Sequence, residues 1–204
     1  MRGFFVSVGL VLCLVLLVGC ASDAPSRFYL LNPLTGEGAV QRAAESCVSV
    51  GIGPIKLPEY VNRPQIVTHT TPNELLLSYF DLWAEPLADG IPRILAENVS
   101  RLLCTKEIVL FPWKPSRIPD YRVEMEVLHM DGTLNKTASL EAWWCISHGT
   151  NKKARVTGRS SYSESVAGQD YGALVQAYSR ILAALSRDIA ETLRELGKSN
   201  LPTE

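Results

Sequence analysis

The stretch YRVEMEV at residues 121–127 decides the fold, because its apolar and charged residues alternate without interruption. Such alternation places the apolar side chains on one face and the charged ones on the other, which is the pattern of a half-buried β-strand. Residues 140–146 repeat the pattern, and residues 154–162 do so more weakly. Three strands in succession predict an antiparallel meander, and Asp131-Gly132 predicts the break after the first of them.

Two amphipathic helices are predicted, one before and one after this meander in the sequence. Apolar residues recur at helical spacing from Ile91 to Leu103, with Asp89 as the cap and Pro92 in the first turn. A longer apolar stripe runs over residues 170–196 and ends at Gly197. Residues 47–55 predict a strand, and residues 65–70 and 74–80 predict a hairpin. The fold class is therefore α+β: a mostly antiparallel sheet, with a meander of strands, and two principal helices packed on it.

Composition restricts the class of protein. The chain has 204 residues, a net charge of −1 and 20% charged residues, and its mean hydropathy is +0.08. The near-neutral charge excludes a protein that binds nucleic acid through a basic face. The strongly apolar residues gather at the N-terminus, so the remainder has the composition of an ordinary soluble domain. We assign residues 47–200 to a single α+β domain.

The first residues have the features of a secretory signal peptide, cleaved after residue 19: a positive charge, an apolar run and a small residue before the cut. The following LVGC at residues 17–20 resembles the bacterial lipobox, which implies acylation of Cys20, as in proteins that carry diacylglycerol and palmitate. Ala21 at the next position favours, by the same resemblance, the periplasmic face of the outer membrane of a Gram-negative bacterium. Residues 20–46 are then a lipidated tether with a short strand at residues 27–31, and an arm of about 25 residues has an r.m.s. span of roughly 25–30 Å.

Catalytic and metal-binding motifs are weak. An oxidising periplasm permits a disulfide, for which Cys47 and Cys104 are the preferred pair. The three histidines have no metal-ligand spacing, and no serine has a GxSxG context. The glycine pair at residues 51–53 predicts a strand bulge, and Asp81 with Glu85 predicts a cap or a surface ion pair. The sequence therefore predicts neither an enzyme nor a metal site nor a cofactor.

Two stretches are more distinctive than the fold requires, namely GPIKLPEYVNRPQIV at residues 53–67 and LWAEPL at residues 82–87. With FYLL at residues 28–31 and YRVEMEV, they make the chain resemble the ABC-type transport auxiliary lipoproteins of the PqiC-like type. The resemblance implies a non-catalytic outer-membrane lipoprotein of an MCE-type lipid transport system. Its implied partners are an MCE-domain periplasmic protein and an inner-membrane permease complex, with homo-oligomers also possible.

Aromatic and arginine side chains dominate the energetics of protein interfaces, so we expect a partner or a neighbouring protomer to contact Tyr60, Arg63, Trp83 and Glu85. Alternatively, Tyr60 and Trp83 close the edge of the sheet. Two other functions remain open at this point. A stand-alone lipid-binding lipoprotein would need its own acyl-chain cavity, and a periplasmic hydrolase would need a nucleophile beside a base.

Overall fold

The computed structural model describes residues 25–34, 48–103, 105, 107–114, 116–149 and 155–199. The predicted signal peptide, the proposed lipidation site at Cys20 and the proposed cysteine pair of Cys47 and Cys104 lie outside these residues.

A five-stranded sheet forms the larger layer, with the strand order β5-β2-β6-β7-β8. Its strands are β2 (Val50–Lys56), β5 (Ile108–Leu110), β6 (Tyr121–Thr133), β7 (Thr137–His148) and β8 (Arg155–Ser165). The antiparallel meander β6-β7-β8 confirms the prediction from the alternating stretches. β2 lies parallel to both β5 and β6, which the sequence did not predict. The bulge expected near Gly53 is present as a register shift between Ile52 and Ile55.

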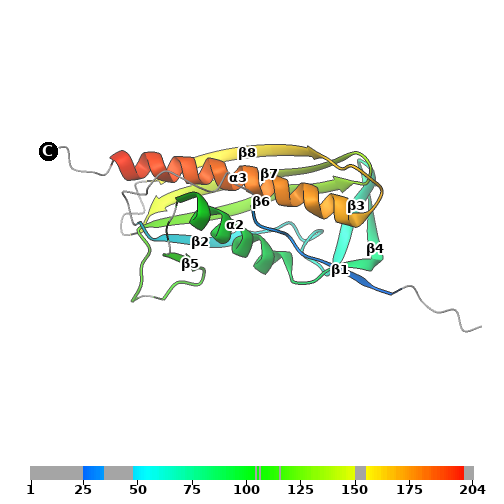
Figure 1. Cartoon of the computed structure of the whole chain (residues 1–204), viewed down its shortest axis with the longest axis horizontal. Coiled ribbons are helices and arrows are strands. Elements are labelled where there is room, and N and C mark those ends of the chain that lie inside the picture. The colour runs from blue at the N-terminus through cyan, green and yellow to red at the C-terminus, as the bar shows by residue number, and fades with distance from the viewer. Residues whose placement is uncertain are drawn as a thin grey trace, which may run out of the picture.

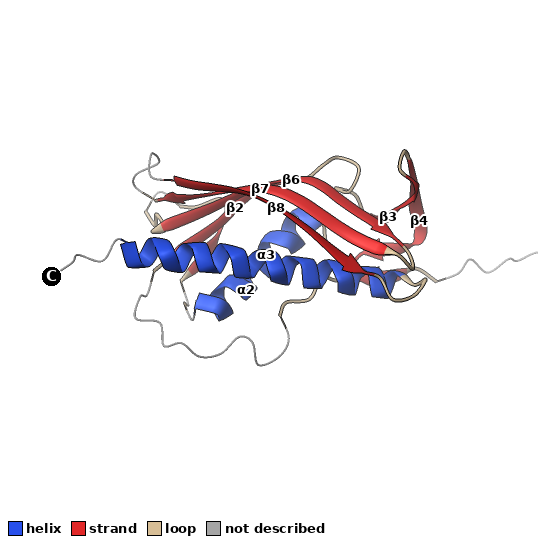
Figure 2. Cartoon of the chain, turned by 90° about the horizontal axis from the view of Figure 1, so that it is seen from above, coloured by secondary structure: helices blue, strands red, loops and turns tan. Residues whose placement is uncertain are grey.

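The two helices are α2 (Leu87–Leu103) and α3 (Tyr171–Ser199). Both cover the same face of this sheet, as Figures 1 and 2 show. The Asp170 carboxylate caps α3 by accepting a hydrogen bond of 2.8 Å from the Ala173 amide. The helix ends differ from prediction: Asp89 lies inside α2, and α3 continues past Gly197. Within the described residues, neither helix combines the length and apolar composition needed to cross a membrane.

A second sheet of three strands lies at one end of the molecule, with the order β1-β4-β3. Its strands are β1 (Arg27–Tyr29), β3 (Gln65–Thr71) and β4 (Glu74–Trp83). β3 and β4 form the predicted hairpin, and β1 pairs with β4 in parallel. Figure 1 shows this sheet at the opposite end from the C-terminal end of α3, and Figure 2 shows the hairpin projecting there. The α+β prediction is thus confirmed, with two sheets in place of one.

The break predicted at Asp131-Gly132 is wrong, because β6 continues through both residues to Thr133. A register shift between Val127 and His129 moves the alternation by one residue, so that Gly132 faces the helices. A Cβ atom on Gly132 would lie 2.6 Å from the Tyr178 hydroxyl oxygen and 2.7 Å from Leu174 Cδ1. This glycine therefore allows α3 to approach the sheet, and the turn falls three residues later at Asn135, whose φ is 57°.

We expect Gly132→Ala to lower the free energy of unfolding by about 1–3 kcal/mol, because the added methyl overpacks the contact between β6 and the fully buried Tyr178. Gly197→Ala is the matched control. No heavy atom lies within 4 Å of the Cβ it would add, and alanine stabilises a helix interior by up to about 1 kcal/mol relative to glycine. Thermal melting of the two variants should therefore shift in opposite directions, and equal shifts would contradict the packing described here.

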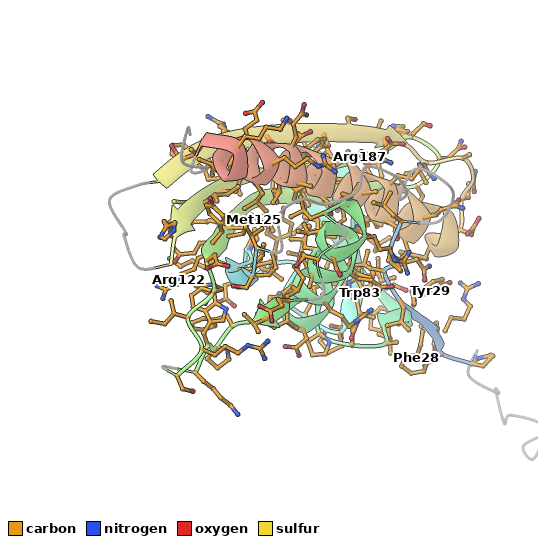
Figure 3. All side chains as sticks on the ribbon, turned by 60° about the vertical axis from the view of Figure 1, so that its left-hand side comes forward. Phe28, Tyr29, Trp83, Arg122, Met125 and Arg187 are labelled. Atoms are coloured by element: carbon orange, nitrogen blue, oxygen red, sulfur yellow. The ribbon has the colours of Figure 1, made fainter. Side chains whose placement is uncertain are left out.

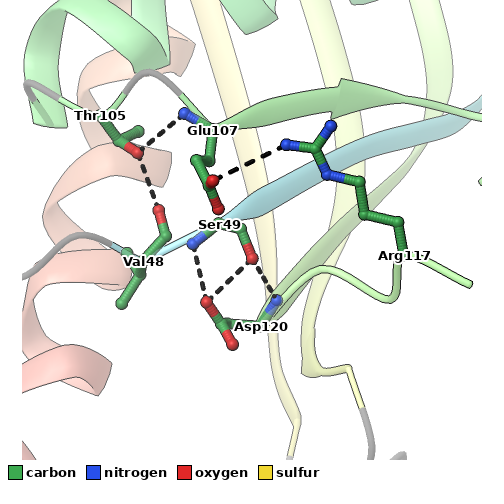
Figure 4. A network of polar contacts seen from close by, with 6 residues as sticks. All are labelled: Val48, Ser49, Thr105, Glu107, Arg117 and Asp120. Carbon is green, nitrogen blue, oxygen red and sulfur yellow. Dashed lines mark hydrogen bonds and ion pairs between the residues drawn. The ribbon is translucent and has the colours of Figure 1, made fainter.

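Polar contacts join the strand ends at the end of the molecule opposite the small sheet (Figure 4). We call β5 and residues 111–114 and 116–120 the far end. The Asp120 carboxylate accepts hydrogen bonds of 2.8 Å from both the amide and the hydroxyl of Ser49. Nearby, the Thr105 hydroxyl donates a 2.8 Å hydrogen bond to the carbonyl oxygen of Val48. These bonds fix the start of β2 between β5 and β6. Val48 and Thr105 adjoin Cys47 and Cys104 in the sequence, whose pairing stays a prediction.

Candidate functional site

The segment of residues 25–34 is packed on the folded body, although the sequence places it in the tether. β1 aligns its three residues with Asp81, Leu82 and Trp83 of β4, and the Ala84 amide donates a 2.9 Å hydrogen bond to the Tyr29 carbonyl oxygen. Figure 3 shows Phe28 and Tyr29 on the same side of the molecule as Trp83, away from Arg122 and Met125. The position of this segment determines which end of the domain follows the proposed lipid anchor.

Asp81 is the polar centre of the β1–β4 contact and is only 4% exposed. Its carboxylate accepts hydrogen bonds of 2.9 Å from the hydroxyls of Tyr29 and Ser78 and pairs with the Arg27 guanidinium at 2.8 Å. Burial raises the pKa of Asp81, but hydrogen bonds from Arg27, Ser78 and Tyr29 outweigh that effect and hold the pKa below the usual 3.8. Asp81 is therefore a buried, ionised link between β1 and β4, rather than the helix cap or surface ion pair that the sequence suggested.

Acid should loosen this contact. Because the pKa of Asp81 is lowered by folding, its stabilising effect is complete above pH 3.8 and is lost as the pH falls further. We expect the free energy of unfolding to fall between about pH 4 and pH 2 by more in the wild type than in Asp81→Asn. Urea titrations at several pH values measure this difference. The exposed Asp89→Asn change is the control, and an acid response in Asp81→Asn equal to that of the wild type would refute the assignment.

The rest of the segment crosses the pair of helices. The Leu31 side chain is 3% exposed and belongs to the hydrophobic core. The Asn32 amide donates a 3.1 Å hydrogen bond to the Ser179 hydroxyl of α3, and the Leu34 amide donates one of 2.8 Å to Asn98 Oδ1 of α2. Arg101 of α2 also donates to the Leu34 carbonyl oxygen. The segment is thus bound to the small sheet at one end and to both helices at the other.

Asn98 connects three parts of the chain. Its side chain is fully buried, with Oδ1 accepting from the N-terminal segment and Nδ2 donating a 3.1 Å hydrogen bond to the Ser186 hydroxyl of α3. The Ser186 hydroxyl in turn donates to the Leu182 carbonyl oxygen. A buried polar group is costly unless it is hydrogen-bonded, so this network specifies where Leu34 binds.

The structure brings the two distinctive stretches together, because the Trp83 amide donates a 2.7 Å hydrogen bond to the Pro64 carbonyl oxygen. Of the four expected partner residues, Trp83 is 7% exposed and packs against Tyr178, with 6.5 Å between ring centroids. Glu85 forms a half-exposed ion pair with Arg93. Arg63 is half-buried, and its Nε atom is buried without a hydrogen-bond partner among the described residues.

Tyr60, the fourth of these residues, joins the two sheets through a polar cluster. Its hydroxyl donates a 2.7 Å hydrogen bond to Asp131 and accepts one of 3.0 Å from the Met130 amide. His69 Nε2 of β3 lies 2.9 Å from the same Asp131 oxygen. Burial raises the pKa of Tyr60 to about 12, so the hydroxyl stays protonated at neutral pH. These contacts favour a structural role for Tyr60, as burial does for Trp83. Of the four expected partner residues, Arg63 and Glu85 are therefore the two that remain candidates for contact with a partner.

Sequence reasoning missed a group of exposed apolar side chains beside β1. Phe28 and Leu30 are 64% and 47% exposed, and Tyr79 and Phe80 on β4 are 88% and 39% exposed. A signal for them exists in the sequence, because LLLSYF at residues 75–80 is apolar without the alternation of a half-buried strand. We call Phe28, Leu30, Tyr79 and Phe80 the anchor-side patch.

The chain is similar to known proteins both in sequence and in fold. The chain is 20% identical over 181 residues to the intermembrane transport lipoprotein PqiC of Escherichia coli (strain K12), an alignment that covers 88% of this chain and 93% of that protein. PqiC of Shigella flexneri gives the same values. The fold is similar to the crystal structure of protein XCC0632 from Xanthomonas campestris, with a TM-score of 0.69, 14% identity and coverage of 85% and 98% of the two chains.

A second crystal structure, of an uncharacterized protein, has a TM-score of 0.67 and 16% identity, covering 83% of this chain and 99% of its own. At these identities the two structures establish the shared fold alone. The family of ABC-type transport auxiliary lipoprotein components matches residues 29–190, which run from the last residue of β1 into α3 and include all the other strands of both sheets. The chain therefore belongs to the family of ABC-type transport auxiliary lipoprotein components.

Proposed function

We propose that the protein is a non-catalytic accessory component of an MCE-type intermembrane lipid transport system. In this proposal, acylated Cys20 attaches it to the periplasmic face of the outer membrane, where it docks the periplasmic MCE-domain protein that works with an inner-membrane permease. The relatives named as intermembrane transport lipoproteins support this function, since they match 88% of the chain.

The observation that carries the proposal is the packed N-terminal segment. In this proposal, a domain that begins to fold within a few residues of its lipid is held in a defined position, in which its remaining exposed surfaces are available to a partner. Asp81 and Tyr60, two groups with shifted pKa values, have hydrogen-bond partners on neighbouring strands or segments and hold these together. The described residues also contain no group of three or more His, Cys, Asp or Glu side chains placed to hold a metal ion.

The interior favours docking over a lipid cavity of the protein's own. A lipoprotein that carries an acyl chain needs an apolar cavity between sheet and helices. Here that space holds a continuous cluster of buried side chains from both sheets and both helices, among them Ile52, Leu95, Leu140 and Leu182. For partner contact we retain Arg63 and Glu85, because both side chains keep exposed surface.

Affinity purification of the full-length lipoprotein from detergent-solubilised membranes tests the proposal. We expect an MCE-domain protein and its permease to co-purify with the wild type, and Arg63→Glu to reduce their recovery. Arg159→Glu is the control, because Arg159 is an exposed arginine of the large sheet that pairs with Glu141. Recovery of the acylated protein without any MCE-domain protein would overturn the proposed function.

A further inference from the structure

The anchor-side patch is exposed because of an irregularity in β4. The pairing of β3 with β4 passes from Gln65↔Leu82 to Val67↔Leu77, so that residues 78–81 of β4 lie opposite the single residue Ile66. Ser78 and Asp81 turn inward and bond to each other. The two residues between them, Tyr79 and Phe80, are therefore pushed out toward solvent.

Phe28 and Leu30 extend the patch from β4 onto the N-terminal segment. β1 places Arg27 beside Asp81 and Phe28 beside Leu82. Because side chains alternate along a strand, Arg27 and Tyr29 face Asp81 while Phe28 and Leu30 face the other way. Leu75 and Leu76 continue the apolar surface along β4, at 38% and 49% exposed. Residues 75–80 contain no charge, and Asp81 next to them is buried in its ion pair.

The length of the chain before β1 shows what lies near this surface. Seven residue steps separate Cys20 from Arg27, and a fully extended chain covers about 25 Å over that distance. As a flexible chain the same segment has an r.m.s. length of about 15 Å. The headgroup layer of a bilayer leaflet is itself about 5–8 Å thick. An acylated Cys20 would thus hold β1, and Phe28 directly after Arg27, close to the membrane surface.

We propose that the anchor-side patch rests in the headgroup layer of the leaflet that holds the lipid anchor, so that the small sheet forms a second, non-covalent contact with the membrane. This inference depends on the acylation of Cys20 in the proposed function. The chemistry of the patch suits that layer, because tyrosine and phenylalanine bury apolar surface while the tyrosine hydroxyl stays hydrated. The contact orients the domain, with the β1-β4-β3 end at the membrane and the far end directed away from it.

Other exposed aromatic residues are positioned differently and serve as controls. Phe111, 51% exposed, packs on Trp113 at the far end with 5.3 Å between ring centroids. Trp143, 54% exposed, lies on the outer face of β7. The Arg159 guanidinium carbon lies over its indole ring, 5.9 Å from the ring centroid. The exposure of both lies within the range of the patch residues, but no short chain connects them to the proposed anchor.

The test is site-specific photocrosslinking of the full-length lipoprotein in cells, with p-benzoylphenylalanine at position 28 or 79 and, as controls, at position 111 or 143. We expect phospholipid adducts, detected by mass spectrometry, at positions 28 and 79 and severalfold fewer at 111 and 143. Equal lipid adducts at all four positions, or adducts at 28 and 79 to a second copy of the chain or to another protein, would overturn the inference.

Labelling with radioactive palmitate in the same cells separates this inference from the proposed function. Palmitate on the chain with no lipid adduct at positions 28 and 79 refutes the membrane contact and leaves the lipoprotein assignment intact. A chain without palmitate refutes the lipid anchor and, with it, the premise of the membrane contact.

Discussion

Leu31→Asp is expected to release the N-terminal segment and to lower the free energy of unfolding by about 3–5 kcal/mol, because it removes a buried leucine and leaves an unpaired carboxylate in the core. For a domain of this size, that loss corresponds to a fall in melting temperature of about 6–20 °C. The strands of the small sheet should loosen first, since Leu31 lies two residues after the end of β1.

Trypsin gives a second, local measurement of the same change. Arg27 has an exposed side chain, but the backbone after it is paired with β4. We expect the bond after Arg27 to resist cleavage in the wild type and to be cut rapidly in Leu31→Asp, as followed by mass spectrometry.

Leu30→Asp is the matched control for both measurements. It makes the same chemical change one residue earlier, at a side chain that is 47% exposed, and should alter stability by no more than about 0.5 kcal/mol. If the two variants have the same melting temperature and the same tryptic cleavage pattern, residues 25–34 do not form part of the folded body.

The second large effect is expected when the chain between the proposed lipid anchor at Cys20 and β1 is lengthened. Inserting about twenty Gly/Ser residues between Asp23 and Ala24 lengthens the chain from Cys20 to Arg27 roughly fourfold, and the effective concentration of a tethered group falls as about the −3/2 power of length. We therefore expect lipid crosslinking at position 79 to fall about eightfold, without a change in melting temperature, because the insertion precedes the packed segment.

The same insertion after Leu201 controls for the added sequence, since it leaves the N-terminal distance unaltered. Its crosslinking should match that of the wild type. Undiminished lipid adducts at position 79 in the N-terminal insertion would show that the patch contacts lipid independently of the anchor, and equal losses in both insertions would show that the added sequence itself causes the effect.

Local sequence patterns predicted strands β2, β6, β7 and β8 of the larger sheet and both helices, but not the short strand β5. The alternation in residues 121–127 and 140–146, and the apolar stripe of residues 170–196, depend only on which face of a strand or helix is buried. The patterns failed where a long-range contact determines the outcome. Gly132 has the sequence context of a turn, yet the approach of α3 requires a glycine within β6.

The N-terminal segment shows the same limit at the candidate site. Its hydrogen bonds join residues far apart in the sequence, such as the Asn32 amide and Ser179, which are separated by 147 positions. No local pattern around Pro33 distinguishes a packed segment from a tether. Among the expected interface residues, Trp83 is predicted from its residue type within a distinctive stretch, and neither property shows whether a tryptophan is buried in the core or exposed.

Hydrogen–deuterium exchange on the acylated protein in membranes tests most directly whether the segment after the lipid is part of the fold. The diagnostic amides are those of Asn32, Leu34 and Ala84, which donate to Ser179, Asn98 and Tyr29 respectively. If residues 25–34 are packed as described, these amides should be protected to a degree approaching that of the β6 amides. Exchange of the Asn32 and Leu34 amides at the rate of an unstructured chain, with β6 still protected, would contradict the account.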